Sequence, residues 1–199
     1  MTGWDAWHPR VVADRLAGLD APWCVAAGWA VDLFLGRRTR THADLEIAVP
    51  ADRFADVAAR FPDCAFHAVR AGTITPATPD SLRGSHQTWA LETAAGVWRF
   101  DVFREPRDAD GWVYRRDRRV RRPYAELIKA TADGVPYLAP EVVLLFKAKG
   151  PRDKDEADFR AVLPALDADG RRWLDGALGL THPAHPWRAA LYPPATPSP

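Results

Sequence analysis

The chain has 199 residues, which is enough for one domain or for one core with a small appendage. Its 27 Lys and Arg nearly balance its 26 Asp and Glu, so the overall charge does not favour nucleic acid or an anionic membrane as a partner. No stretch reaches the roughly 18 apolar residues that a membrane span needs, and the amino terminus lacks the basic start and apolar run of a signal peptide. We therefore expect a soluble cytoplasmic protein.

The first half of the chain predicts alternating helices and strands. Apolar spacing favours a helix over residues 10–18, and the apolar run 23–27 favours a buried strand that ends at a glycine. A short helix over 30–35 is predicted to stop at the next glycine. Residues 44–49 alternate as a strand does, and 52–61 have apolar residues at helical spacing.

The middle of the chain is expected to add strands to the same sheet. Residues 66–69 favour a strand, and 73–85, which contain two prolines, favour a loop. The runs 88–93 and 97–103 are joined by a short turn with a glycine, which predicts an antiparallel hairpin. The order of these elements predicts an α+β fold.

Helices are expected in the last third of the chain. The segment 141–149 follows a proline and favours a helix. Residues 153–166 carry apolar side chains at i, i+3, i+4 and i+7, which favours a second one. The α+β fold therefore ends in a helical region.

Cysteine and histidine spacing gives no metal site. Cys24 and Cys64 are not part of a Cys-x-x-Cys or a Cys/His pattern, so we expect reduced thiols rather than a structural zinc. His42 lies two residues before Asp44, so it faces the same side and can orient a carboxylate if that strand begins so early.

Asp44 and Glu46 are the first candidates for chemistry. Residues two apart on a strand share a face, about 6.5 to 7 Å from each other, so their carboxylates can converge on one cation. Ligands that are all oxygens suit Mg²⁺, which takes its other ligands from water and substrate phosphates. The alternative is a solvated acidic face of a half-exposed strand.

The residues before this strand are suited to bind phosphate. Gly28 and Trp29 open a helix after a buried strand, where backbone N–H groups and the helix dipole favour an anion. Arg37, Arg38 and Arg40 form a cationic loop that can meet a triphosphate. An ordinary strand-to-helix turn and a solvated arginine loop are the alternatives.

Residues 27–46, from Ala27-Gly28-Trp29-Ala30 through Gly36-Arg37-Arg38-Thr39-Arg40-Thr41-His42-Ala43-Asp44-Leu45-Glu46, resemble the nucleotidyltransferase superfamily of DNA polymerase β type. They look closest to its aminoglycoside 2″-O-adenylyltransferase-like branch. The resemblance implies a mixed β-sheet flanked by helices, with a helical carboxy-terminal region. It also implies Mg²⁺-dependent transfer of a nucleoside monophosphate, AMP from ATP, to a hydroxyl of a small molecule such as an aminoglycoside-like compound.

The resemblance also implies roles for residues further along the chain. It implies a third carboxylate on a neighbouring strand, and Asp101 is the candidate, as a metal ligand or as the base for the acceptor hydroxyl. If the resemblance is set aside, Asp101 could equally form an ion pair with Arg99 or Arg104. Lys147 and Lys149 are candidates to bind phosphate, although two residues apart on a helix they cannot share a face.

On this resemblance we expect a nucleotidyltransferase core at 1–125 and a helical region packed on the core at 126–192. Residues 193–199 are rich in proline, so we expect a disordered tail there. Trp29 and Trp89 are candidates to line a ligand cleft.

Two departures leave a second hypothesis open. Ala27 replaces the first glycine of the branch's pair, and Glu46 stands where the second carboxylate is more often Asp. A nucleotide-binding or structural relative without turnover therefore remains an alternative. The arginine-rich block 115–122 supports a third hypothesis, transfer to RNA or protein, but it lacks interleaved aromatic residues.

Overall fold

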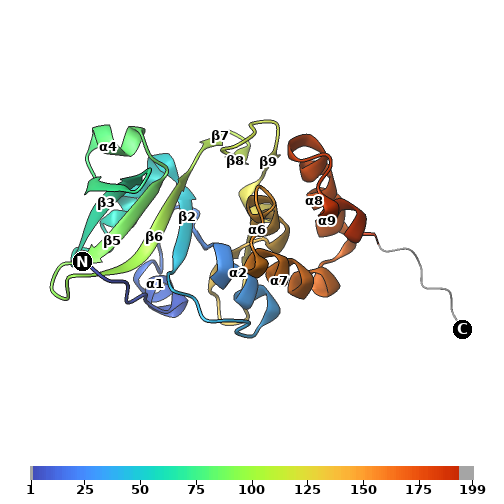
Figure 1. Cartoon of the computed structure of the whole chain (residues 1–199). Coiled ribbons are helices and arrows are strands. Elements are labelled where there is room, and N and C mark those ends of the chain that lie inside the picture. The colour runs from blue at the N-terminus through green and yellow to red at the C-terminus, as the bar shows by residue number, and fades with distance from the viewer. Residues whose placement is uncertain (1, 193–199) are drawn as a thin grey trace, which may run out of the picture. The chain divides into compact units, whose positions relative to one another are not determined.

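The computed structural model describes residues 2–192 and divides the chain into two compact units, Met1–Ala139 and Pro140–Pro199 (Figure 1). The tail predicted at 193–199 lies outside the described residues. Within the described part of the chain, every helix is too short or too polar to cross a membrane.

An eight-stranded sheet forms the frame of the first unit, in the order β10-β11-β1-β2-β6-β5-β3-β4. Its strands are β1 (Cys24–Val25), β2 (Glu46–Pro50), β3 (Cys64–Arg70), β4 (Thr73–Pro76), β5 (Gln87–Glu92), β6 (Val97–Glu105), β10 (Ile128–Ala130) and β11 (Pro136–Leu138). The pairs β2·β6 and β1·β11 are parallel, whereas the other pairs are antiparallel. The predicted α+β class with a mixed sheet is therefore confirmed, and β5 and β6 form the predicted hairpin.

Short helices and a small second sheet complete this unit. The helices are α1 (Pro9–Arg15), α2 (Ala27–Leu35), the 3₁₀ helix η1 (Ala51–Arg53), α3 (Phe54–Ala58), α4 (Pro79–Arg83) and α5 (Tyr124–Leu127). The second sheet has the order β7 (Arg107–Asp108), β8 (Gly111–Val113) and β9 (Arg121–Arg122). Under the large sheet, the rings of Trp7, Phe61 and Phe100 pack together, with centroids 4.7 to 6.1 Å apart.

The prediction of a loop over residues 73–85 is wrong. This segment contains β4, which pairs with β3, and then α4. Pro79 is compatible with α4 because it stands in the first turn, where the amide N–H would have no helical partner. Thr78 caps that turn by accepting a hydrogen bond from the amide of Ser81 at 3.2 Å.

Residues near the amino terminus run along the start of β6, in line with β2. The amide of Asp5 donates to the carbonyl of Trp98, and the amide of Trp7 donates to that of Arg99, each at 3.1 Å. Further along the same edge, Asp101 donates its amide to the carbonyl of Leu45 at 2.8 Å, and β2 begins one residue later. The amino-terminal segment and β2 thus follow one another along the same edge of β6.

The described part of the second unit is helical, as predicted for the carboxy-terminal region, but it begins at Pro140 rather than at residue 126, because β10 and β11 belong to the large sheet. Its helices are α6 (Pro140–Lys147), α7 (Asp153–Val162), the 3₁₀ helix η2 (Leu163–Ala165), α8 (Ala168–Thr181) and α9 (Pro186–Ala190). α6 packs on α7 and α8, and the rings of Phe159 and Trp187 stack with centroids 4.4 Å apart. The sequence analysis predicted the first two helices but not α8, whose first turn is capped by Asp167.

Candidate active site

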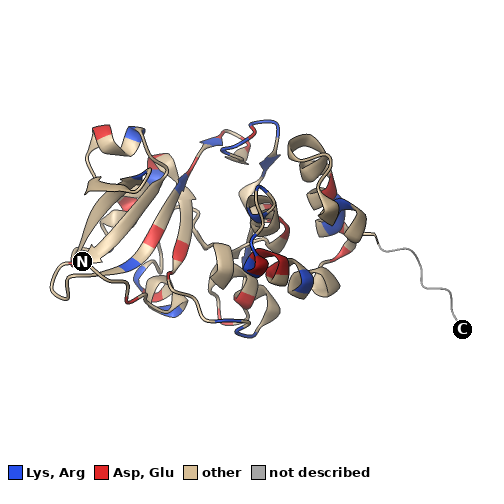
Figure 2. Ribbon diagram, viewed as in Figure 1, with Lys and Arg blue, Asp and Glu red and all other residues tan. Residues whose placement is uncertain are grey.

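Asp101 and Glu46 lie side by side on the two central strands. They are direct register partners in the parallel pair β2·β6, so both side chains are on the same face of the sheet (Figure 2). The Asp101 side chain is buried, whereas Glu46 is half-buried. The structure therefore brings two of the three predicted carboxylates together.

Asp44 stands just before this pair. The strand predicted from residue 44 begins instead at Glu46, so Asp44 belongs to the preceding loop, and its side chain is exposed. It is still close enough to Asp101 for its charge to act on that carboxyl.

The Asp101 carboxyl has one satisfied and one unsatisfied oxygen. Its Oδ2 accepts a hydrogen bond from Gln87 Nε2. Its Oδ1 is buried and has no hydrogen-bond partner among the described residues. The predicted alternative, a pair with Arg99 or Arg104, is wrong, because Arg99 pairs with Glu92 and Arg104 donates to Thr88. A buried oxygen without a partner is costly, so this carboxyl is suited to a ligand rather than to a structural role.

Burial also changes the acidity of this group. It raises the pKa of the Asp101 carboxyl from 3.8 to about 7, and the charge of Asp44 adds to the rise. Hydrogen bonds from Gln87 and its neighbours act in the opposite direction. A carboxyl with a pKa near neutrality can accept a proton from a hydroxyl during a reaction.

The donor set fits a magnesium ion. Carboxylate oxygens are the ligands that Mg²⁺ prefers, and Asp101, which has an unpartnered Oδ1, is the register partner of Glu46. No group of three His, Cys, Asp or Glu side chains close enough to hold a metal occurs within residues 2–192. Two carboxylates are nevertheless sufficient, since Mg²⁺ in nucleotide enzymes usually takes its other ligands from phosphates and water.

The turn between β1 and α2 lies against the start of β2. The amide of Ala26 donates to the carbonyl of Glu46 at 2.8 Å. Ala26 is the residue before α2, and its methyl side chain cannot cap the helix. The first amides of α2 are thus available to an anion near the carboxylates.

Ala27 has an uncommon backbone in this turn. Its φ is +49°, in the left-handed region that favours glycine. This explains why a glycine is expected here, and it shows that Ala27 keeps the conformation of the turn at some cost in strain.

Gly28 makes room for the loop that follows α2. A Cβ at this position would clash with the Arg40 guanidinium and would lie 2.7 Å from Nδ1 of His42. From the sequence, this glycine is expected to let backbone N–H groups approach a phosphate. The structure adds that it admits Arg40 and His42, so any larger residue would push the loop away from the turn.

A buried carboxylate, Asp32, holds this loop in place. Its Oδ1 accepts hydrogen bonds from the amide of Thr39 at 3.0 Å and from the Thr39 hydroxyl. Its Oδ2 lies 2.6 Å from Nε2 of His42, and both side chains are almost fully buried. His42 is thus paired with a carboxylate, as predicted, but the partner is Asp32 on α2 and not Asp44.

Asp32 was not among the predicted site residues. Its signal in the sequence is a single acid within the apolar run Ala30-Val31-Asp32-Leu33-Phe34. A charge in such a run is buried unless the helix turns it outward, and a buried charge needs a partner.

Trp29 covers the other side of the loop. Its ring lies 4.8 Å from that of His42 and 5.2 Å from that of His8. The Arg38 guanidinium lies 5.7 Å from the same indole. Arg40 is half-buried against Gly28, so Arg38 and Arg40 lie near the start of α2, whereas Arg37 is exposed and follows the end of that helix.

Lys147 and Lys149 belong to the second unit. The Lys147 ammonium lies 2.6 Å from Asp155 and 2.8 Å from Asp158, and both carboxylates are buried. Lys149 is exposed. Within its own unit, Lys147 is therefore engaged by two acids.

The arginine-rich block 115–122 is largely paired with acids. Arg115 pairs with Glu105, Arg119 with Asp117, and Arg121 with Asp108. Neutralised arginines give little attraction to a phosphate backbone, so the block does not favour nucleic acid as a partner.

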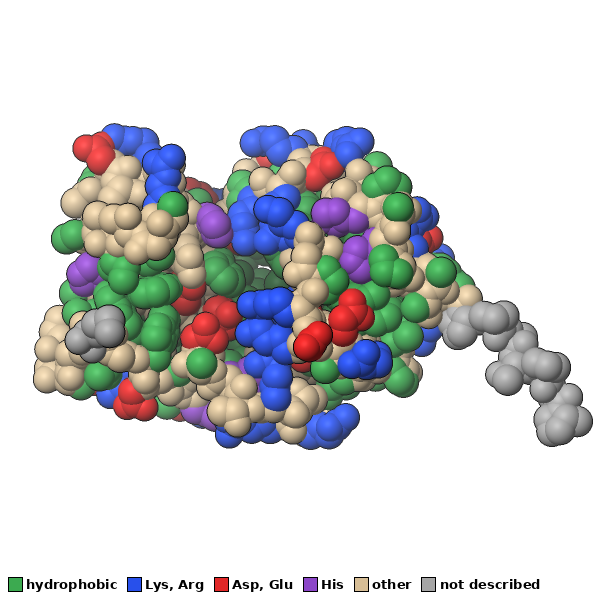
Figure 3. Space-filling view, in the orientation of Figure 1, with side chains coloured by type: hydrophobic (Ala, Val, Ile, Leu, Met, Phe, Trp, Pro, Cys, Tyr) green, Lys and Arg blue, Asp and Glu red, His purple; other side chains and the backbone are tan. Residues whose placement is uncertain are grey.

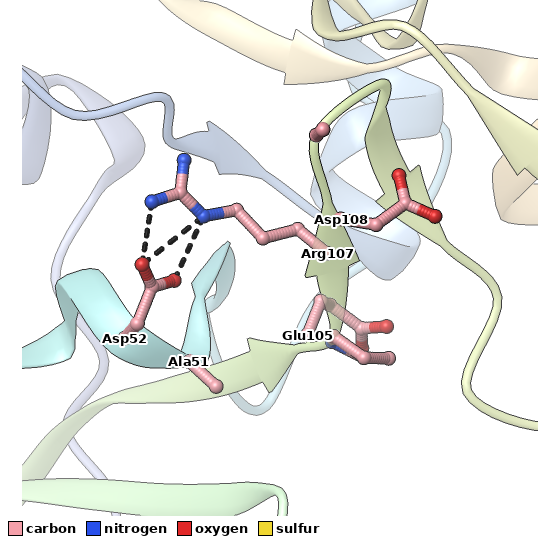
Figure 4. Close-up of a pocket in the computed structure, with 7 residues that line it drawn as sticks. Ala51, Asp52, Glu105, Arg107 and Asp108 are labelled. Atoms are coloured by element: carbon pink, nitrogen blue, oxygen red, sulfur yellow. Dashed lines mark hydrogen bonds and ion pairs between the residues drawn. The ribbon is translucent and has the colours of Figure 1, made fainter.

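A hollow of about 560 Å³ lies at the other end of β6, beside Ala51, Asp52 and residues 105–109. Asp52 and Arg107 form an ion pair on its wall (Figure 4). Glu105 is four residues beyond Asp101 on β6, about 13 Å along the strand. The hollow is thus separate from the candidate site.

Comparisons with known proteins agree with the motif. Residues 10–77 match the family model described as aminoglycoside-2″-adenylyltransferase, a range that includes Gly28, Asp44 and Glu46. The predicted resemblance is thus confirmed for this segment. A comparison with curated protein sequences found no match.

Solved structures show the fold. The solution structure of the antibiotic-resistance factor ANT(2″)-Ia has 15% identity and a TM-score of 0.57, covering 88% of this chain and 91% of that one. A crystal structure of ANT(2″)-Ia with adenylyl-2″-tobramycin has 14% identity and a TM-score of 0.54, with 87% and 94% covered. The lincomycin-bound lincosamide adenylyltransferase LnuA has 15% identity and a TM-score of 0.54, with 77% and 92% covered.

Proposed function

We propose that this chain, which has the fold of the antibiotic nucleotidyltransferases, transfers a nucleoside monophosphate from a nucleoside triphosphate to a hydroxyl of a small molecule. The observation that carries the proposal is the buried Asp101, which has an unpartnered oxygen and is the register partner of Glu46. The open start of α2 lies next to that pair through the bond from Ala26 to Glu46. Acidic ligands, an anion site and a base of suitable pKa are thus adjacent.

The residues divide the reaction between them. Asp44 and Glu46 would hold Mg²⁺, with Asp101 as a further ligand or as the base, and the metal would supply neutralisation of phosphate charge. The first amides of α2, together with Arg37 and Arg40, would bind the phosphates. The acceptor oxygen forms a bond to the α-phosphorus while the bond to pyrophosphate breaks. Asp101 takes the proton of the acceptor hydroxyl.

ATP is the proposed donor, and a small antibiotic-like compound the proposed acceptor. The family model that matches residues 10–77 is named for an adenylyltransferase of aminoglycosides. Two of the similar structures contain an adenylylated aminoglycoside and a lincosamide. What these have in common is a sugar or sugar-like ring with a reactive hydroxyl, and that chemistry is what we extend to this chain.

The test compares two aspartates. Asp44→Asn should reduce Mg·ATP-dependent pyrophosphate release, measured with a library of hydroxyl compounds, by 100-fold or more. Asp52→Asn is the matched control, because Asp52 pairs with Arg107 away from the site. Retention of full transfer by Asp44→Asn would show that the assignment is wrong.

A relative without turnover is the second candidate, and the strain at Ala27 favours it. Such a protein would bind Mg·ATP without releasing pyrophosphate to any acceptor. Calorimetry with Mg·ATP, beside the pyrophosphate assay, separates the two candidates.

A further inference from the structure

The two sides of Asp101 differ in chemistry, and the inference below rests on the function proposed above. On the β2 side lie Glu46 and the start of α2, which suit phosphates and their metal. On the β5 side, Trp89 is the direct register partner of Asp101, so it lies on the same face. Neighbouring strands are about 4.8 Å apart, so a group on either side can reach the Asp101 carboxyl. With the triphosphate on the β2 side, the acceptor enters over β5.

Three tryptophans, Trp4, Trp89 and Trp98, form an indole cluster on the β5 side. The ring centroid of Trp89 lies 5.1 Å from that of Trp4 and 5.3 Å from that of Trp98. Trp4 and Trp89 are only half-buried. Figure 3 shows hydrophobic side chains gathered over this part of the sheet, next to the acidic side chains on β2 and β6. The cluster thus offers a partly open aromatic surface adjacent to the proposed base.

One polar atom of this cluster lacks a well-formed hydrogen bond. The indole N–H of Trp89 is buried and makes no hydrogen bond of standard geometry among the described residues, but its interaction with the Asp101 carboxyl lowers the pKa of that group. Asp101, whose Oδ1 also lacks a hydrogen bond of standard geometry, is the register partner of Trp89. This donor and acceptor face each other without a hydrogen bond of standard geometry, so a hydroxyl group that enters between them can accept from the indole and donate to the carboxyl.

The charges on this side do not suit a polycation. From Cys64 to Glu105, every Asp and Glu other than Asp101 pairs with an arginine: Asp80 with Arg83, Glu92 with Arg99, and Glu105 with Arg115. Arg99 also pairs with Asp5, beside the cluster. A compound with several ammonium groups would have to displace these arginines to find counter-charges. An uncharged ring would not.

We infer that the acceptor is an uncharged, hydroxyl-bearing ring compound that stacks on Trp89 and Trp4 and presents its hydroxyl to Asp101. Aromatic faces bind the apolar face of a ring, and Gln87 supplies a further polar group at the same edge. The acceptor is selected by ring stacking and one hydroxyl rather than by charge.

The experiment follows two substrates in one assay. The wild-type chain and the variants Trp89→Leu and Trp89→Phe are tested for pyrophosphate release with Mg·ATP. One acceptor set is uncharged aryl glycosides, and the other is the polycationic aminoglycoside tobramycin. Trp89→Leu should raise KM for the glycosides at least tenfold, with KM for Mg·ATP within about threefold of wild type. Trp89→Phe should restore most of the affinity, because a ring face is kept.

Trp29→Leu is the matched control on the nucleotide side, since Trp29 lies on α2. It should raise KM for Mg·ATP and leave KM for the glycosides within about threefold. A rise in KM for Mg·ATP with Trp89→Leu would instead place the nucleotide base on the indole cluster and overturn the inference. A tenfold higher kcat/KM for tobramycin than for every glycoside, weakened by Glu92→Gln, would also overturn it.

A binding measurement separates this inference from the proposed function. Glycosides added without ATP should quench indole fluorescence with saturation in wild type and not in Trp89→Leu. Quenching without pyrophosphate release supports the inference and counts against turnover. Absence of quenching at millimolar glycoside overturns the inference even if another acceptor is adenylylated. If Trp89→Leu does not fold, Trp4→Leu, on the amino-terminal segment, gives the same comparison.

Discussion

Asp32 and Asp101 are both almost fully buried carboxylates in the same unit, yet their surroundings differ. Asp32 receives two hydrogen bonds from Thr39 on one oxygen and lies against His42 with the other. Asp101 has Gln87 on one oxygen and no described partner on the other. Both oxygens of Asp32 are therefore satisfied by side chains and backbone of the same protein, whereas only one oxygen of Asp101 is.

This difference helps to distinguish a buried carboxylate with a structural role from one that is a candidate for a chemical role. Burial alone would make both aspartates candidates for an active site, because buried ionisable groups are concentrated at functional sites. The number of satisfied oxygens discriminates between them. Asp32 fixes the loop that carries Arg40 and leads to Asp44, whereas Asp101 lies between Glu46 and Trp89 on the central strands.

The largest expected effect is a loss of turnover without a loss of stability. Asp101→Asn should lower kcat for nucleotidyl transfer by 1,000-fold or more, because an amide cannot accept the proton of the acceptor hydroxyl. Its unfolding free energy should not fall, since the amide fits the same space and removes a buried charge. Steady-state kinetics and urea denaturation measure the two quantities. Near wild-type turnover would exclude Asp101 as the base.

At Asp32, we expect substitution to reduce stability. Asp32→Ala should lower the unfolding free energy by about 3 to 5 kcal/mol, because it removes the buried acceptor of the Thr39 donors and the carboxylate that pairs with His42. Asp14→Ala, on an exposed position of α1, is the control and should change stability by less than about 0.5 kcal/mol. Equal stabilities of the two variants would contradict a structural role for Asp32.

The third prediction concerns pH in the metal-free protein. Because burial raises the pKa of Asp101 from 3.8 to about 7, the folded state binds more protons than the unfolded state between these values. The contribution of this group is fully present below pH 3.8 and is lost as the pH rises through 7. The loss should be on the order of 2 to 4 kcal/mol. Urea denaturation of wild type and Asp101→Asn at pH 4 to 8 tests this, and parallel pH profiles would refute it.

The smallest effect is at Ala27, the first residue of α2, which precedes Asp32 in the same helix. Ala27→Gly should raise the unfolding free energy by about 0.5 to 1 kcal/mol, because glycine has no strain at positive φ. Ala71 has a φ of +47° in the turn between β3 and β4, so Ala71→Gly should give a similar gain. Only Ala27→Gly should also lower KM for Mg·ATP. Equal kinetics for both variants would separate the turn from nucleotide binding.

The sequence predicted part of the arrangement of the acidic residues. The spacing of Asp44 and Glu46 predicted one shared strand, but β2 begins at Glu46, and Asp101, which the resemblance supplied, is the residue that lies beside Glu46. Asp32 and Gln87 were missed, since the burial and partners of a polar side chain depend on segments that fold onto it. The loop predicted over 73–85 was wrong for a related reason, because proline was taken as an end of structure when it starts α4.

The placement of Trp4 was also beyond local patterns, since its pairing with β6 crosses much of the chain.

That pairing has a consequence for how the protein is made. Asp5 is bonded to Arg99, 94 positions later, so the amino-terminal segment leaves the ribosome long before its partner strand exists. Its indoles must stay exposed until β6 has been synthesised, and long-range contacts of this kind form slowly. The acceptor side of the site should therefore be among the last parts of the first unit to mature. A chain released before β6 would expose apolar rings suited to recognition by a chaperone.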